Sequence, residues 1–166
     1  MTFIENNLIE NEEIIHKAKI HWLIFFTALF WSAVAAGVYY YGKIELEIEN
    51  GSVEVFTIIF MLLALWHFAK ATLHKYFTEL AITDRRMIAK FGFIRRETIE
   101  IPLLKVESVL IDQSILERIM GSGSVAVHGT GSAMAPVKYI DAPVEFRNQL
   151  NNAMSKARDE YKEDAI

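Results

Sequence analysis

Residues 22–41 form an uncharged stretch, WLIFFTALFWSAVAAGVYYY, that restricts this chain to a few kinds of fold. At about 1.5 Å per residue, a helix of this length reaches roughly 30 Å, the thickness of the hydrocarbon core of a bilayer. Trp22 stands at one end and Tyr39, Tyr40 and Tyr41 at the other, as in the aromatic belts of membrane interfaces. The stretch therefore predicts a membrane-spanning helix.

Small residues recur along this span at helical spacing. They are Ala28, Ser32, Ala33, Ala36 and Gly37. Small side chains let a second helix approach closely inside a membrane, so we predict a helix-packing face here. The alternative is that small residues are simply common in this segment.

A second apolar stretch covers residues 55–69, between Glu54 and Lys70. Its length alone fits either a membrane span or a buried core helix. The stretch is apolar around its whole circumference, its charged flanks can snorkel, and a short connection joins it to the first span. We predict a transmembrane hairpin over residues 22–76, with spans at about 22–41 and 55–76.

A cleaved signal peptide is the alternative explanation for the first stretch, because Ala33-Val34-Ala35 resembles a cleavage site. Signal peptides begin with a short basic segment. Residues 1–21 are longer than that and carry four glutamates against two lysines, which disfavours cleavage.

The charges that flank the spans predict the orientation of the hairpin. The connection 42–54 carries one lysine and four glutamates, whereas residues 70–96 carry seven basic residues against two acidic ones. The positive-inside rule then places residues 1–21 and the C-terminal region in the cytoplasm and the acidic loop outside. Asn50-Gly51 within that loop resembles a hairpin turn, so the loop is either a small ribbon or a simple turn.

After Thr78 the hydrophobic period changes from helical to two, which is typical of strands. We predict an antiparallel meander of short strands at 78–83, 86–93, 96–103, 105–113, 124–130 and 136–140. In the fourth of these, Val106, Ser108 and Leu110 share one face by simple alternation. Residues 17–22 also alternate polar and apolar side chains, so we expect an extended strand that pairs with this sheet.

Two helices interrupt or follow the strands. Ser114 and Glu117 form a capping box for a short helix over 114–121, with Gly121 as its C-terminal cap. The last helix begins near Pro143 and buries an apolar stripe that includes Phe146 and Leu150. Residues 159–166 form a charged tail.

A set of short motifs resembles the bacterial pleckstrin-homology (PH)-like domain membrane proteins, a family formerly described as a domain of unknown function. The motifs are Thr83-x-Arg85-Arg86, Gly92, Ile101-Pro102-Leu103-x-Lys105-Val106, Leu116-x-Arg118-x-x-Gly121-x-Gly123 and Gly129-Thr130-Gly131. The resemblance implies an α+β membrane protein. By this resemblance, residues 77–158 are expected to form a split antiparallel β-barrel capped by the C-terminal α-helix. It also implies homo-oligomers, and it brings no known reaction.

Composition and motif spacing disfavour several kinds of chemistry. The net charge of −4 disfavours nucleic acid as a partner, and the absence of cysteine excludes thiolate sites. The glycine-rich stretch 121–132 lacks the spacing of a phosphate-binding loop, so turn glycines explain it better. The five histidines lack the spacing of metal ligands. We therefore expect no enzyme activity, no cofactor and no metal site.

A cluster of basic residues soon after the second span is the candidate lipid-binding site. It consists of Arg85, Arg86, Lys90, Arg95 and Arg96. Juxtamembrane cations attract anionic lipids by about 1 kcal/mol each. The alternative is that these residues only enforce topology and solubility. The two arginine pairs fall in successive turns of the meander, and we expect them at opposite ends of the sheet.

These features together predict a non-enzymatic, multi-pass protein of the bacterial inner membrane with both termini in the cytoplasm. The leading hypothesis is a scaffold that assembles with copies of itself or binds another membrane protein. The alternative is a sensor of anionic lipids or headgroups that uses the juxtamembrane arginines. Membrane lipids are partners in both.

Overall fold

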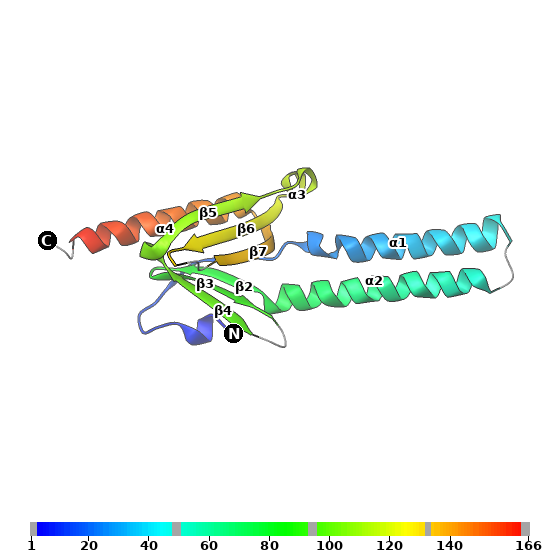
Figure 1. Ribbon diagram of the computed structural model, residues 1–166, viewed down its shortest axis with the longest axis horizontal. Coiled ribbons are helices and arrows are strands. Elements are labelled where there is room, and N and C mark those ends of the chain that lie inside the picture. The colour runs from blue at the N-terminus through cyan, green and yellow to red at the C-terminus, as the bar shows by residue number, and fades with distance from the viewer. Residues whose placement is uncertain (1–2, 48–50, 93–95, 132–133, 164–166) are drawn as a thin grey trace. The chain divides into compact units, whose positions relative to one another are not determined.

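The computed structural model describes residues 3–47, 51–92, 96–131 and 134–163, which belong to two compact units (Figure 1). One unit, here called the sheet domain, combines Met1–Leu23 with Tyr76–Ile166. The other, the helical hairpin, is Ile24–Lys75. The N-terminal segment therefore folds with the C-terminal part of the chain, from which the hairpin separates it in sequence.

The sheet domain contains two antiparallel sheets (Figure 1). The first has the order β1-β2-β3-β4, with β1 at Ile14–Ala18, β2 at Glu79–Thr83, β3 at Arg86–Phe91 and β4 at Glu97–Pro102. The second has the order β5-β6-β7, with β5 at Val106–Asp112, β6 at Ser122–Gly129 and β7 at Met134–Asp141. The strands predicted from Thr78 onward are confirmed. An N-terminal strand also pairs with β2, but it lies at Ile14–Ala18 and overlaps the strand predicted over 17–22 only at residues 17 and 18.

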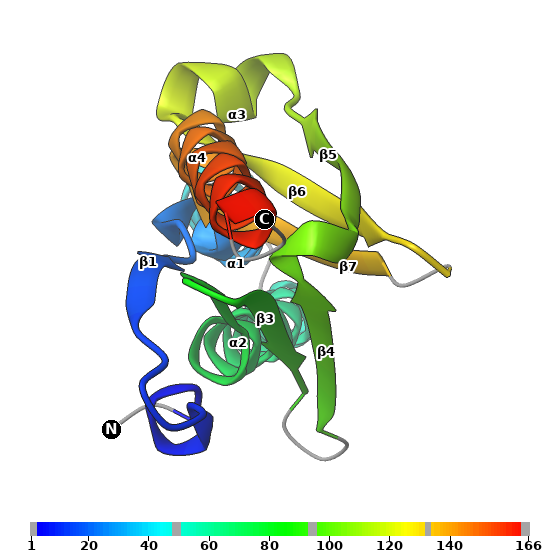
Figure 2. The same ribbon diagram turned by 90° about the vertical axis from the view of Figure 1, so that its left-hand side faces the viewer.

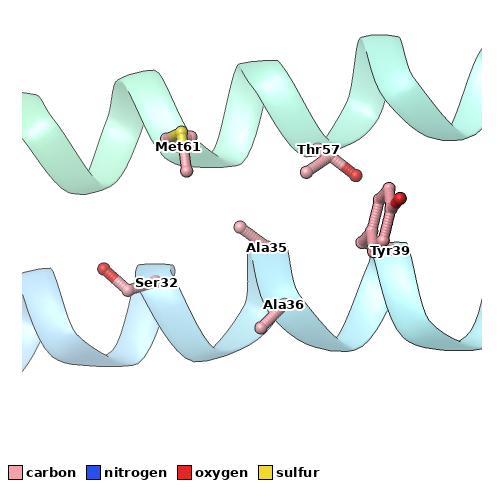
Figure 3. Close-up of a pocket in the computed structure, with 6 residues that line it drawn as sticks. All are labelled: Ser32, Ala35, Ala36, Tyr39, Thr57 and Met61. Carbon is pink, nitrogen blue, oxygen red and sulfur yellow. The ribbon is translucent and has the colours of Figure 1, made fainter.

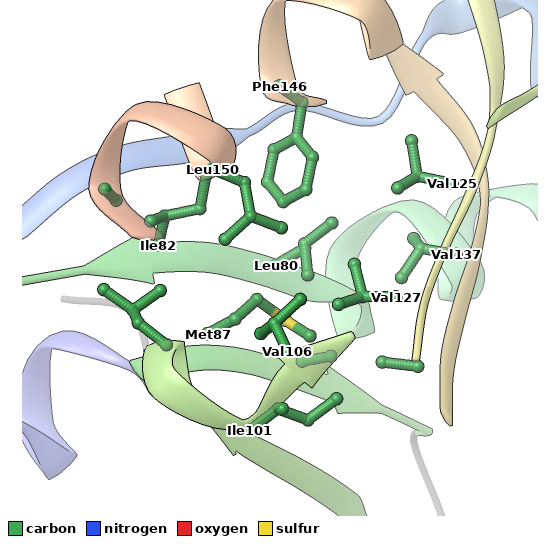
Figure 4. Close-up of a cluster of buried hydrophobic side chains, with 14 of the residues drawn as sticks. Leu80, Ile82, Met87, Ile101, Val106, Val125, Val127, Val137, Phe146 and Leu150 are labelled. Carbon is green, nitrogen blue, oxygen red and sulfur yellow. The ribbon is translucent and has the colours of Figure 1, made fainter. Parts of the chain in front are cut away.

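The hydrophobic core lies between the facing sides of the two sheets (Figure 4). Because side chains alternate along a strand, Leu80, Ile82 and Met87 point to this side of the first sheet. Val125 and Val127 of β6 meet them from the second sheet.

Helix α4, Pro143–Glu163, completes this core. It contacts β1 and β2 of one sheet and β5 and β6 of the other (Figure 2). Its residues Phe146 and Leu150 point into the core with an exposed fraction of 0% (Figure 4). The apolar stripe predicted for this helix is therefore confirmed.

Hydrogen bonds join the two sheets beyond the end of β1. Ile20 forms an isolated antiparallel bridge with Ile140 of β7. The Asp141 N–H donates to the Lys19 carbonyl at 2.8 Å, and the His21 N–H donates to the Tyr139 carbonyl at 2.6 Å. The first and last strands of the domain are thereby connected. At the opposite edge of each sheet lie β4 and β5, and the 3-10 turn η4, Leu103–Lys105, connects these two strands.

The prediction that Val106, Ser108 and Leu110 share one face of β5 is wrong for Val106. Val106 is buried, but Ser108 and Leu110 are exposed, and Val109 and Ile111 pack against the core instead. The cause is a register shift between Val106 and Ser108 in the pairing with β6. A bulge of this kind moves every later side chain to the other face.

The short helix α3, Ile115–Met120, forms as its caps predict. Ser114 and Glu117 make both bonds of the capping box, and the backbone N–H of Ser114 donates to the Glu117 carboxylate at 2.9 Å. Gly121 ends the helix with φ +76°, a conformation that glycine adopts without a Cβ penalty.

The helical hairpin consists of two long helices and a distorted turn. Its elements are η2 at Trp22–Phe25, α1 at Phe26–Tyr40, a π-helical turn η3 at Tyr41–Glu45, and α2 at Ser52–Phe77; the first two residues of η2 and the last two of α2 belong to the sheet domain. Trp31 of α1 stacks on Phe60 of α2 with ring centroids 5.7 Å apart. The alternative that loop 42–54 forms a small β-ribbon is wrong at Ile44, because this residue lies in η3. Asn50 of the predicted hairpin turn lies outside the described residues.

We predict that Phe146→Ala lowers the stability of the sheet domain by about 3–5 kcal/mol, because it leaves a cavity where the two sheets meet α4. Hydrogen exchange of the β2 and β6 amides in the detergent-solubilised full-length protein measures this change. Val144→Ala is the matched control, since Val144 on the same helix is 44% exposed. Equal exchange in the two variants would contradict the assignment of Phe146 to the core.

Candidate functional site

The outer face of the first sheet, opposite the core, carries a cluster of charged side chains centred on Arg86. Its guanidinium donates to Glu12 twice, from Nε to Oε1 at 2.9 Å and from Nη2 to Oε2 at 2.8 Å. Nη1 donates to Glu100 Oε2 at 2.7 Å. The bidentate geometry is that of strong arginine–carboxylate pairs, so Arg86 connects the N-terminal segment to β4.

Glu12 is buried despite its charge, with a side chain that is 0% exposed. The Thr83 hydroxyl donates to its Oε1 at 2.8 Å, and the Ile9 N–H donates to its Oε2 at 2.7 Å. Both carboxylate oxygens are therefore hydrogen-bonded, as a buried charge requires.

These contacts shift two pKa values in opposite directions. Burial raises the pKa of Glu12. The hydrogen bonds from Arg86, Ile9 and Thr83, together with the charge of Arg86, outweigh burial and hold that pKa below its ordinary value. The hydrogen bond to Glu12 raises the pKa of Arg86. Both groups are therefore charged at neutral pH.

A second set of contacts fixes the first residues of the chain. Ile4, which is fully buried, packs with Ala81 and Ile88 on the outer face. The backbone N–H groups of Phe3 and Ile4 donate to the Glu79 carboxylate at 3.3 Å each. Lys90 Nζ lies 3.4 Å from Glu79 Oε1 and 4.3 Å from the centroid of the Phe3 ring. Residues 3–12 thus cover part of this face, and we call them the N-terminal cover.

The structure does not bring the predicted lipid-binding residues together. Arg86 and Lys90 bind the N-terminal cover. Arg85 is exposed beside the β2–β3 turn, and Arg96 is exposed before β4, at the other end of the sheet. Arg95 lies outside the described residues. The expected separation of the two turns is confirmed, while binding of lipid by any of these residues stays a prediction.

The helical hairpin contains an apolar groove between its two helices (Figure 3). Its volume is about 250 Å³, and the residues that line it are Ser32, Ala35, Ala36 and Tyr39 of α1 with Thr57 and Met61 of α2. The Ser32 hydroxyl donates to the Ala28 carbonyl at 3.0 Å and the Thr57 hydroxyl to the Val53 carbonyl at 2.8 Å. Because these bonds stay within each helix, the groove presents a mainly apolar surface.

The residues of the predicted helix-packing face occupy three different positions. Ala28 is buried within the hairpin, as is Ala35, which the sequence analysis missed. Ser32 and Ala36 line the groove. Ala33 is exposed, and open space surrounds the position that a Cβ on Gly37 would take.

Close packing accounts for part of the glycine-rich stretch. Gly123 and Gly129 lie inside strand β6, not in turns as predicted. A Cβ on Gly123 would come within 2.7 Å of Gln113 Cγ, and one on Gly129 within 2.7 Å of Ile101 Cγ2. Among the described residues, no group of three or more histidine, aspartate or glutamate side chains is placed to hold a metal ion.

Comparison with known proteins supports one family. A family model described as a bacterial PH domain matches residues 14–154. The match runs from the first residue of β1 into α4 and includes the hairpin. No curated protein and no solved structure matches the chain.

We predict that Glu12→Gln loosens the N-terminal cover, because the neutral amide cannot replace the bidentate ion pair. Its opening free energy should fall by about 2–3 kcal/mol. Hydrogen exchange of residues 3–18 in the full-length protein measures this loss. Glu10→Gln is the control, since Glu10 is an exposed residue of the same segment. Unchanged protection in Glu12→Gln would show that apolar contacts alone hold the cover.

The lowered pKa of Glu12 also predicts a pH dependence. Ionised Glu12 stabilises the cover at pH values above the ordinary carboxyl value of 4.5, and this contribution is lost as the pH falls through the lower pKa of the folded state. Protection of residues 3–18, corrected for intrinsic exchange, should therefore decrease below about pH 4.5. The decrease in protection should be smaller in Glu12→Gln than in the wild-type protein. An equal decrease in both would show that other carboxyl groups cause the pH dependence.

Proposed function

The chain belongs to the bacterial PH domain family, and from this membership we propose that it is a membrane-anchored, non-catalytic module that assembles with copies of itself. PH-like domains are generally non-catalytic, which favours a binding role. The observation that carries the proposal is the apolar groove in the helical hairpin.

The exposure of the hairpin supports a membrane anchor. Trp22–Ile44 and Ser52–Phe77 are long and apolar enough to cross a membrane. Only 22% and 11% of their most apolar windows are buried, whereas the core helix of a soluble protein is mostly buried. Large side chains such as Leu62 and Trp66 are exposed. Apolar surface of this extent needs lipid or protein around it.

We assign the orientation from charge and the domain from topology. The positive-inside rule places residues 1–21 and 77–166 in the cytoplasm of a bacterial cell and loop 42–54 outside the inner membrane. The hydrogen bonds that join Lys19 and His21 to β7 support a split β-barrel, with α4 as its cap.

The groove supports assembly inside the bilayer. Lipid tails are as apolar as leucine, so helices associate there through close packing and not through the hydrophobic effect. Ala35 and Ala36 leave room along α1 for side chains of a neighbouring helix (Figure 3). A second copy of the hairpin is the occupant that we propose, although another membrane protein or a lipid chain has the same apolar chemistry.

A lipid sensor is the alternative function. It depends on Arg85 and Arg96, whose side chains are exposed. Arg86 and Lys90 favour it less, because their charges face Glu12 and Glu79.

We predict that Ala36→Leu, which fills the groove, weakens self-association at least about tenfold through steric overlap with the neighbouring helix. Subunit counting by single-molecule photobleaching in lipid vesicles, over a range of protein densities, measures the association. Ala69→Leu makes the same change at an exposed position of α2 and should leave association intact.

Two results would contradict this assembly. Wild-type protein that stays monomeric at every density would exclude self-association. A multimer that survives Ala36→Leu would place the contact elsewhere on the molecule.

A further inference from the structure

Helix α3 carries an unusual concentration of exposed apolar side chains. Ile115 is 83% exposed and Ile119 is 76% exposed, and Leu116 beside them is 48% exposed. The capping box holds this short helix in a defined shape, so the two isoleucines form a fixed apolar ridge. Large apolar side chains grouped on a surface mark a binding site for protein or membrane.

Hydrogen bonds place the ridge at one particular end of the sheet domain. The Ala142 N–H donates to the carbonyl of Gly121, the cap of α3, at 2.9 Å. The next residue back, Asp141, donates to the Lys19 carbonyl, and Lys19 lies shortly before Trp22, where the chain leaves the domain for the hairpin. Within the sheet domain, α3 therefore lies at the end where β1 finishes and β2 begins (Figure 1).

Other side chains at this end have the character of a membrane interface. Trp22 is 51% exposed and Tyr76 is 72% exposed, and both belong to the sheet domain. Amphipathic aromatic rings favour the headgroup region of a bilayer. Arg118 on α3 and Arg96 before β4 are exposed cations at the same end, and anionic headgroups attract such cations.

We propose that α3 inserts its isoleucine ridge into the surface of the bilayer that the hairpin crosses. Ile115 and Ile119 then lie among the upper acyl chains, and Arg118 lies among the headgroups. This inference rests on the proposed membrane anchor and adds a second contact of the sheet domain with lipid. The contact would give the domain a defined orientation on the membrane.

A lipid surface fits the ridge better than a protein partner does. A stable protein interface buries about 1,200–2,000 Å² and needs a complementary shape, and a helix of six residues offers only a small part of that. Insertion into lipid needs no matching surface. The proposed anchor also tethers the sheet domain to the bilayer, so even a weak insertion is favoured by the high local concentration.

The experiment uses the absence of cysteine from the natural sequence. Ile115→Cys and Ile119→Cys are labelled separately with the environment-sensitive fluorophore NBD in the full-length protein. The protein is reconstituted into vesicles of phosphatidylethanolamine and phosphatidylglycerol. We expect blue-shifted NBD emission at both positions. Most of the fluorescence intensity should be quenched when the vesicles contain lipids with doxyl groups on their acyl chains.

Two control positions separate this inference from the proposed anchor. Leu65→Cys, on the exposed surface of α2, should be quenched if the hairpin spans the bilayer. Leu104→Cys, in η4 beside the β2–β3 turn at the opposite end of the sheet domain, is 47% exposed and should keep water-like emission without quenching.

Each other outcome overturns the proposal. Water-like emission at 115 and 119 with quenching at 65 excludes insertion of α3 and leaves the anchor standing. A blue shift that doxyl lipids do not quench, and that grows with protein density, assigns the ridge to a second copy of the chain. Absence of quenching at 65 removes the anchor and the insertion together.

Discussion

The pairing of β1 with β2 is the interaction on which the rest of the structure depends. The two strands are separated in sequence by the whole hairpin, yet Ala18 and Leu80 are direct partners in the sheet. Partners in an antiparallel pair lie about 4.5–5.5 Å apart. The chain therefore leaves the sheet domain and returns to it at neighbouring points, a few residues beyond that pair. Two helices that start so close together reach the normal packing distance of about 8–10 Å with only a short connection to each strand.

The same strand also makes the N-terminal cover possible. Once β1 is in the sheet, residues 3–12 extend back over the outer face, where Ile4 and Glu12 become buried. A buried ion pair contributes little net stability compared with apolar side chains of similar volume, but removing one partner is costly. The Glu12–Arg86 pair therefore serves mainly to fix one position of the cover.

Local patterns explain which parts of the fold could be predicted from the sequence. Period-two alternation indicated the strands, and the Ser114–Glu117 spacing indicated the cap of α3, because each depends on neighbouring residues. The bulge in β5 has no such signature, so Val106 was wrongly predicted to share a face with Ser108 and Leu110. Glu12 and Arg86 lie 74 positions apart, and no periodicity connects residues at that separation. Glu12 is one of three glutamates between Ile9 and Ile14, so its place in the segment does not distinguish it from Glu10 and Glu13.

The open edges of the two sheets offer another route to assembly, and their composition argues against it. Within the described residues, β4 and β5 each pair with one neighbouring strand, so a further strand has room to add there. Pro102 lacks an N–H to donate, and Glu97 and Glu100 place negative charge along β4, which are common devices against edge pairing. If the hairpin spans the membrane as proposed, its groove needs neither free N–H groups nor charge neutralisation, and the shared bilayer confines the copies to two dimensions. Weak helix packing is then sufficient for association, which is why the proposed assembly is placed in the hairpin and not at the sheet edges.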